Sequence, residues 1–219
     1  MVNVAPVDPL KWERQLWDGG YRRIGGVDEV GRGALAGPLI AAAVILPLHV
    51  SDLRGVSLGW MEVRDSKTLT HRRRLAIAEW ILASGARVSI AAISCDELDT
   101  IGLAAANRCA MERAVRALTE QPDFLLIDAM TLDLDTPQIG IIDGDAQSLS
   151  IAAASIVAKV HRDAIMVELD RDYPGYGFAR HKGYGVPMHL AALREFGPCP
   201  SHRRCFAPVR KAVIARDDA

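Results

Sequence analysis

Residues 22–46 read RRIGGVDEVGRGALAGPLIAAAVIL, and this stretch decides the fold. Residues 22–28 carry Ile24 and Val27 and are predicted to form a strand that ends at the acidic pair Asp28-Glu29. Residues 39–46 are a continuous apolar run, which is typical of a strand covered on both faces. The glycine-rich segment between them predicts a turn that joins two adjacent strands.

Strands and helices alternate along the rest of the chain. Further strands are predicted at residues 87–93, 124–128 and 138–142. Helices are predicted at residues 70–83, from a cap at Asp96 or Asp99 to about 118, from Ser148 or Ser150 to 172, and at 187–196. Two adjacent strands followed by alternating helices and strands indicate an α/β domain with a mixed sheet.

Length and composition describe an ordinary globular protein. The chain has 219 residues, 26 Lys and Arg against 27 Asp and Glu, and 50% apolar residues, which is enough to bury a core without disulfides. Its four cysteines are widely spaced, as expected for a reducing cytosol. No apolar run approaches the ~18 residues of a membrane span, and the N-terminus shows no secretory signal. We expect a soluble, cytoplasmic protein with no membrane association.

Charge is distributed unevenly along the chain. Residues 120–172 hold eleven acids and three bases, whereas residues 178–216 hold eight bases and one acid. This arrangement suggests a cation-binding centre beside a surface that binds a polyanion. Two solvated faces of opposite sign would produce the same pattern.

Four acids stand at or near the ends of predicted strands: Asp28, Glu29, Asp128 and Asp145. Because a sheet places strand ends side by side, these carboxylates can converge, and their mutual repulsion is costly unless a cation compensates it. Mg²⁺ prefers oxygen ligands, and two such ions can support phosphodiester hydrolysis. Acids are also common in loops, so ordinary surface carboxylates remain an alternative.

The turn Gly31-Arg32-Gly33 fits neither a dinucleotide-binding nor a Walker pattern. Its glycines let the backbone approach a ligand closely. A backbone carbonyl can accept a hydrogen bond from a ribose 2′-OH, the group that distinguishes RNA from DNA. An ordinary hairpin would explain the same glycines.

Five motifs, in this order, resemble ribonuclease HII: DEVGRGALAGP (28–38), DSKTLT (65–70), FLLID (124–128), AAASIVAKVHRD (152–163) and GFARHKGYG (177–185). The resemblance spans roughly residues 22–206. It implies a ribonuclease H-like fold, with a mixed five-stranded sheet flanked by helices and a short helical C-terminal extension. The corresponding division is an N-terminal segment (1–20), a catalytic domain (21–197) and a basic C-terminal tail (198–219).

The resemblance also implies an activity. Members cut the phosphodiester on the 5′ side of ribonucleotides, in RNA–DNA hybrids and at single ribonucleotides in duplex DNA, and leave a 3′-hydroxyl and a 5′-phosphate. They use two Mg²⁺ or Mn²⁺ ions, and we expect a monomer. A non-catalytic nucleic-acid-binding module and another carboxylate nuclease of the same fold are the alternatives.

The family's site residues map onto individual positions of this chain. The catalytic, metal-binding acids correspond to Asp28, Glu29, Asp128 and Asp145. The substrate-binding positions are Gly31, Arg32, Gly33, Lys67, Lys159, Lys182 and Tyr184. By this resemblance the glycine turn reads the ribose, Tyr184 packs on the adjoining sugar, and the lysines contact phosphates or organise the site. Asp163 is expected to be a helix residue and not a metal ligand.

One departure from the family pattern affects the fourth acid. Asp143-Gly144 precedes Asp145, where relatives usually have Lys-Gly or Lys-Ala. An acid in place of a base beside the metal site makes Asp143 a competitor for the role of Asp145.

A zinc site is the other alternative. Cys199, His202 and Cys205 have a metal-like spacing, but structural zinc needs four ligands, and the fourth would have to be His181 or His189. The competing interpretation is that these cysteines are reduced, small apolar side chains.

Overall fold

The computed structural model describes residues 8–47, 50, 59–63 and 69–217. Its sheet has five strands in the order β3-β2-β1-β4-β5. The strands are β1 (Ile24–Val30), β2 (Leu39–Ile45), β3 (Arg87–Ile93), β4 (Phe124–Asp128) and β5 (Gln138–Ile141). The pairs β1–β2 and β2–β3 are antiparallel, whereas β4 runs parallel to β1 and β5 parallel to β4. The predicted mixed α/β sheet is confirmed.

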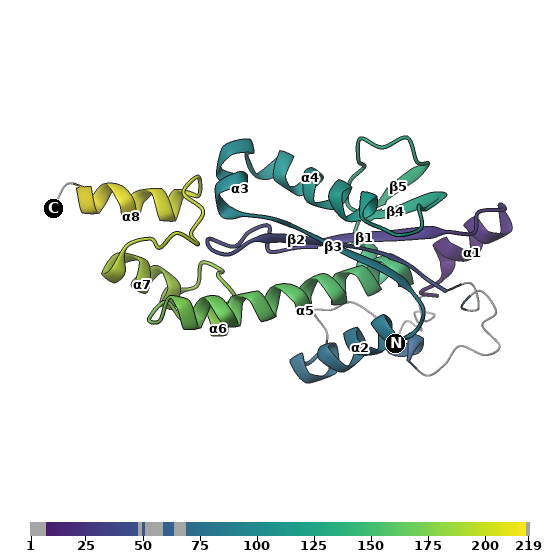
Figure 1. Ribbon diagram of the computed structural model, residues 1–219, viewed down its shortest axis with the longest axis horizontal. Helices are drawn as coiled ribbons and strands as arrows, with labels where there is room; N and C mark the ends of the chain where they lie inside the picture. The colour runs from purple at the N-terminus through teal and green to yellow at the C-terminus, as the bar shows by residue number, and fades with distance from the viewer. Residues whose placement is uncertain (1–7, 48–49, 51–58, 64–68, 218–219) are drawn as a thin grey trace, which may run out of the picture.

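Helices cover both faces of this sheet (Figure 1). One face carries α2 (His71–Ala83) and α5 (Leu149–Asp172), and the other carries α3 (Cys95–Ile101) and α4 (Leu103–Arg116). Beyond the turn between β1 and β2 lie α6 (Phe178–His181), α7 (Pro187–Phe196) and α8 (Ala207–Asp217), and α1 (Lys11–Asp18) lies at the opposite end. None of the described helices is long and apolar enough to cross a membrane.

The apolar run in β2 explains its central place. All seven of its residues are buried, because alternate side chains face the two helical layers. Ile40, Ala42 and Val44 pack in the core under α5 and α2, whereas Ala41 and Ala43 pack in the core under α4. The strand is covered on both faces, as its sequence predicts.

The helix caps confirm two predictions and correct one. Thr70 caps α2 by accepting a hydrogen bond from the Arg73 N–H, and Ser148 caps α5. The predicted long helix starting at Asp96 or Asp99 is wrong: Ser94 is the cap, and Gly102 divides the segment into α3 and α4. Gly102 has a φ of 81°, a conformation that a helix cannot contain.

The start of α5 is held by a residue from α1. Glu13 is fully buried, and its Oε1 accepts hydrogen bonds from Ser148 Oγ at 2.6 Å, Ser150 N at 2.9 Å and Ser150 Oγ at 2.8 Å. Burial raises the pKa of this carboxyl above its usual range. The N-terminal segment thus supplies a core residue, and the proposed division of the chain into three parts stays a prediction.

At Gly26 the backbone of α5 lies directly against β1. A Cβ at this position would lie 2.1 Å from the carbonyl carbon of Ser150. Gly26→Ala should therefore force α5 from β1 and lower the free energy of unfolding by about 3 kcal/mol. Urea denaturation measures this. At Gly33 an added Cβ meets nothing within 4 Å, so Gly33→Ala should stay within about 0.5 kcal/mol of the parent. Equal losses in the two variants would contradict the close packing.

Candidate active site

Three of the predicted acids meet where β1 and β4 end. The two strands are parallel neighbours, with Val27 opposite Ile127, so Asp28 and Asp128 follow at the same edge. One carboxylate oxygen from each of Asp28, Glu29 and Asp128 lies within 4.8 Å of the others. Within the described part of the chain, no other set of three or more His, Cys, Asp or Glu side chains converges in this way.

Burial and repulsion make this cluster electrostatically unfavourable. Removal from water, followed by the charge of Glu29, raises the pKa of Asp28 well above its ordinary value. The pKa of Glu29 is raised by burial and by the charge of Asp128, and Arg32 opposes the shift. Hydrogen bonds from Ser155 and from the Glu29 N–H to Asp28 offset part of the cost. A bound cation would offset the remainder.

Asp145 stands beside this group and is not one of the three. It is buried in a short 3₁₀ turn, η5 (Gly144–Ala146), that leads into α5. The turn is tied to the cluster because Gly144 N donates a hydrogen bond of 2.8 Å to Asp128 Oδ1. Asp143, the competing acid, is exposed and has a left-handed backbone with φ 52°. The metal-binding role of Asp145 stays a prediction.

A cavity of about 280 Å³ opens above the three acids. It brings together most of the predicted site residues, and its other lining residues are Val30, Gly31, Arg32, Gly33, Arg74, Ser155, Lys159 and Tyr184. Lys182 does not line it: the ammonium of Lys182 donates to the Ala179 carbonyl at 2.8 Å. Lys67 lies outside the described residues.

The turn at Gly31 requires a glycine. Its φ is 87°, and a Cβ would lie 2.1 Å from Nε of Arg162, which is buried beneath it. Arg162 donates hydrogen bonds to the carbonyls of Ala36, Pro38 and Lys182, at 3.0, 2.9 and 2.9 Å. Its guanidinium also lies 5.6 Å from the centre of the Tyr184 ring. Arg162 therefore connects the glycine turn with the Tyr184 loop.

Arg74, Ser155 and Asn107 are site residues that the motif reasoning missed. Arg74 and Ser155 line the cavity, and the side chain of Asn107 lowers the pKa of Glu29, in opposition to the effect of burial. A signal was available in the helical register, because Arg74 shares the buried face of α2 with Ile77 and Ala78. A polar residue on the apolar face of a helix indicates that its side chain contacts the protein interior.

Asp163 pairs with two basic side chains at the site and is not among the clustered acids. Its carboxylate pairs with Lys159 Nζ at 2.6 Å and with Arg74 Nη1 at 3.9 Å. The side chains of Lys159 and Arg74 both line the cavity, so Asp163 holds two positively charged side chains at the cavity wall. This arrangement agrees with the expectation that Asp163 is a helix residue.

The histidines considered for zinc form a different structure. His189 does reach His202, with their Nε2 atoms 3.0 Å apart, and Cys199 Sγ lies 3.1 Å from His202 Nδ1. Cys205 is exposed, and its backbone N–H donates to Asp99. The zinc interpretation has no support in the described residues, because these side chains hydrogen-bond to one another instead of facing a common point.

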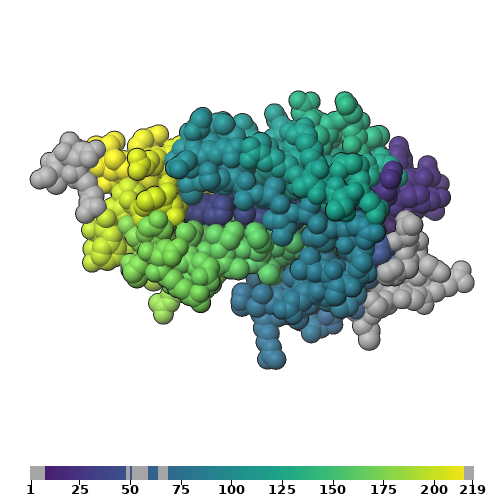
Figure 2. Space-filling model, viewed as in Figure 1, coloured from purple at the N-terminus to yellow at the C-terminus, as the bar shows by residue number. Residues whose placement is uncertain are grey.

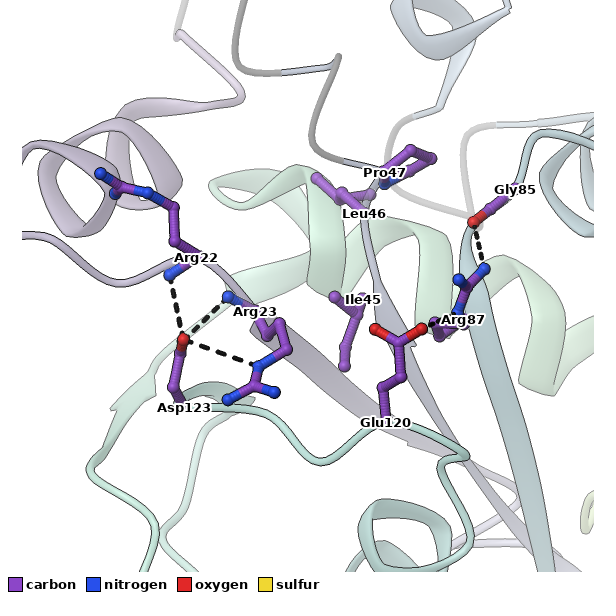
Figure 3. A pocket seen from close by; sticks show the side chains of 9 residues that line it. All are labelled: Arg22, Arg23, Ile45, Leu46, Pro47, Gly85, Arg87, Glu120 and Asp123. Atoms are coloured by element: carbon purple, nitrogen blue, oxygen red, sulfur yellow. Dashed lines mark hydrogen bonds and ion pairs between the residues drawn. The ribbon is translucent and has the colours of Figure 1, made fainter.

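A larger cavity, of about 540 Å³, lies at the opposite end of β1 (Figure 3). Ile45, Leu46 and Pro47 supply its apolar side. Its charged residues satisfy one another: Asp123 accepts from the backbone N–H groups of Arg22 and Arg23, and Arg87 pairs with Glu120 at 2.7 Å. The acidic cluster lies in the smaller cavity, so the smaller cavity is the candidate active site.

Comparison with known proteins identifies the family of the chain. The model of the ribonuclease HII family matches residues 25–209. The chain belongs to the ribonuclease HII family. A ribonuclease HII of Geobacillus kaustophilus is 49% identical over 208 residues, which cover 95% of this chain and 77% of that protein. One from Desulfitobacterium hafniense is 49% identical over 205 residues, covering 93% and 76%.

Solved structures show the same fold. The ribonuclease H2 of Pyrococcus horikoshii superposes with a TM-score of 0.74 at 23% identity, covering 90% of this chain and all of that one. A Bst-RNase HIII structure in complex with Mn²⁺ gives a TM-score of 0.66 at 18% identity, covering all of this chain and 77% of that one.

Family membership settles the class of activity. The protein is a hydrolase, an RNase H-type endonuclease that acts on nucleic acid. The two alternatives, a non-catalytic binding module and a different carboxylate nuclease, are thereby removed.

The buried charge of Asp28 should cost stability in the metal-free protein. Since its folded pKa is raised, its stabilising contribution is present below the unfolded pKa and is lost as pH rises through the folded value. Asp28→Asn should therefore stabilise the metal-free protein at pH 7 by about 1 kcal/mol, a melting-temperature rise of roughly 2–4 °C. The gain should shrink as pH falls and vanish below about pH 3, where the wild-type carboxyl is protonated in both the folded and the unfolded state. Calorimetry in chelator measures it, and a gain independent of pH would contradict the electrostatic origin.

Proposed function

We propose that the enzyme cleaves the phosphodiester on the 5′ side of a ribonucleotide, in RNA–DNA hybrids and at single ribonucleotides in duplex DNA. The products are a 3′-hydroxyl and a 5′-phosphate. The observation that carries the proposal is one cavity that contains both the acidic cluster and the glycine turn. Carboxylates suit a hydrolytic metal centre, and a close-approach backbone turn suits recognition of a 2′-OH.

The donor set fits hard divalent cations. Asp28, Glu29 and Asp128 offer three carboxylate oxygens within 4.8 Å, and Asp145 is a fourth acid in the adjoining turn. Burial first, and then mutual repulsion, raise the pKa values of Asp28 and Glu29, and a bound cation would oppose both effects. We assign two Mg²⁺ or Mn²⁺ ions to these four acids. Such ions, when bound, lower the pKa of an attacking water and offset charge on the departing 3′ oxygen.

The remaining residues hold the substrate. Gly31, Arg32 and Gly33 face the 2′-OH, and Tyr184 packs on the adjoining sugar with 37% of its surface exposed. Lys159 supplies positive charge for a phosphate, with its direction set by Asp163. Lys67 and Lys182 remain predicted phosphate contacts from outside the described cavity lining. The enzyme is proposed to act as a monomer in the cytoplasm.

Cleavage of a labelled DNA duplex with one ribonucleotide tests this function. Incubation with Mg²⁺ or Mn²⁺ should produce a single cut 5′ to the ribonucleotide, and chelator should abolish it. An all-DNA duplex of the same sequence is the control, since it lacks the 2′-OH. Efficient cutting of the all-DNA duplex, or no cutting with either metal, would refute the proposal.

Asp145 and Asp143 should differ in their effect on activity. Asp145 is buried and linked to Asp128 through Gly144, so Asp145→Asn should lower kcat/KM by about 10–100-fold. Asp143→Asn removes an exposed charge and should change it by no more than about threefold. Steady-state cleavage at saturating Mn²⁺ compares the two variants. The reverse order would assign the fourth acid to Asp143.

A further inference from the structure

Arg203, in the segment predicted to be a basic tail, lies fully buried beneath the glycine turn. Its Nη1 donates to the carbonyls of Gly31 at 2.7 Å and Arg32 at 3.1 Å, and its Nε and Nη2 both donate to Gly37 O, at 3.0 and 2.8 Å. None of the ion pairs among the described residues joins Arg203 to a carboxylate. Backbone carbonyls thus solvate a buried charge, and that charge in turn orients the carbonyls.

The backbone around Arg203 is joined to the same turn. Arg203 N donates to Leu35 O at 2.9 Å, Gly37 N donates to Ser201 O at 2.8 Å, and Ala36 and His202 form a β-bridge. On the outside, Gly37 and Pro38 line a hollow together with residues of α3 and α5 and residues 200–201. Figure 2 shows purple atoms from the early part of the chain in a recess between the teal, green and yellow segments. The C-terminal segment therefore packs directly against the turn.

These contacts determine which backbone carbonyls of the turn can still accept a hydrogen bond. The Gly31 carbonyl accepts from both Arg203 Nη1 and Ala34 N, at 2.7 and 3.2 Å, which uses both of its lone pairs. A substrate hydroxyl therefore cannot use it. The Arg32 carbonyl accepts one longer bond from Arg203 and retains a lone pair. Arg203 thus helps decide which backbone group remains available to a ribose.

The neighbouring residue, His202, is connected to Tyr184 through a chain of hydrogen bonds. Cys199 N donates to His202 Nδ1 at 3.0 Å, so the proton of the neutral ring is on Nε2. That N–H donates to His189 Nε2, and His189 Nδ1–H then donates to the Tyr184 carbonyl at 3.0 Å. Both rings are buried, and burial lowers the pKa of His202 to about 4, which keeps it neutral near pH 7.

We propose that His202 and Arg203 are positioning residues that hold the glycine turn and the Tyr184 loop in one fixed arrangement and thereby set the enzyme's preference for a ribonucleotide. Arg203 acts on the turn, and His202 acts on Tyr184 through His189. This inference rests on the proposed function. It assigns to the C-terminal segment a role in specificity, in place of phosphate binding by these two side chains.

The Arg203 part is tested with two duplexes, one carrying a single ribonucleotide and one a 2′-deoxy-2′-fluoro nucleotide, which cannot donate a hydrogen bond. Arg203→Lys keeps the charge and loses the planar fork, and Arg203→Gln removes the buried charge and provides a second variant if the first is unstable. Assays at 10 °C with Mn²⁺ should show kcat/KM on the ribonucleotide falling about 100-fold. The preference over the fluoro duplex should fall about tenfold, as expected for a lost 2′-OH contact.

Arg171→Lys is the matched control, because Arg171 is an exposed arginine that pairs with Glu168 on α5. It should leave both rates unchanged. The inference is overturned if wild type cuts at the ribonucleotide and both Arg203 variants keep the full preference for the ribonucleotide duplex over the fluoro duplex. In that outcome kcat/KM falls by the same factor on both duplexes, and Arg203 serves stability alone. If wild type does not cut at the ribonucleotide, the proposed function itself fails.

The His202 part is tested by a double-mutant cycle. His202→Asn removes the donor to His189 and should lower kcat/KM about tenfold, whereas His202→Gln can place an amide nitrogen near the position of Nε2 and should restore most of it. In a Tyr184→Ala background, His202→Asn should have less than about a twofold effect. His161→Asn, at an exposed site on α5, is the control. Equal losses in both backgrounds would show that His202 does not act through Tyr184.

Discussion

Asp28 loses its hydration where β1 ends, and Glu29 and Asp128 add negative charge around it. This placement follows from the sheet, because the parallel strands β1 and β4 carry these acids at the same edge, and Asp28 is the last buried residue of β1. Moving a carboxylate out of water costs free energy, and a second and third carboxylate increase that cost. The same three oxygens suit a divalent cation, and a bound cation would offset this cost.

Positive charge is buried close by, and it is compensated differently. Arg162 and Arg203 are both fully buried, and together they donate to six backbone carbonyls, those of Gly31, Arg32, Ala36, Gly37, Pro38 and Lys182. Carbonyl dipoles solvate a guanidinium without neutralising it, and the planar fork fixes their directions. A turn that would otherwise expose flexible glycine backbone thus has a defined conformation beside the acids.

The two sets of charges explain why distant segments of the chain meet at one cavity. Glu13 from α1 holds the start of α5, Asp163 from α5 holds Lys159 and Arg74, and Arg203 from the C-terminal segment holds the glycine turn. Each contact satisfies a buried polar group that would be costly if left alone. The residues of the site are therefore held by buried hydrogen bonds and ion pairs, and they come from segments far apart in the sequence.

Much of this was readable from sequence by itself. The apolar run of β2, the acids near the ends of β1 and β4 and the caps at Thr70 and Ser148 depend on local pattern and periodicity, and they predicted a mixed sheet whose acids can converge. The ordered motifs added, by resemblance, the ribonuclease H-like fold and the set of metal-binding acids. The helical register of α2 also contained a signal for the burial of Arg74. The break at Gly102, the burial of Asn107, and the positions of Arg162, His202 and Arg203 were decided only by tertiary structure. A charged or imidazole side chain in a sequence is compatible with solvent, a phosphate or a buried carbonyl. The choice among them depends on which partners the folded chain brings within hydrogen-bonding distance, and those partners lie up to 172 residues away in sequence.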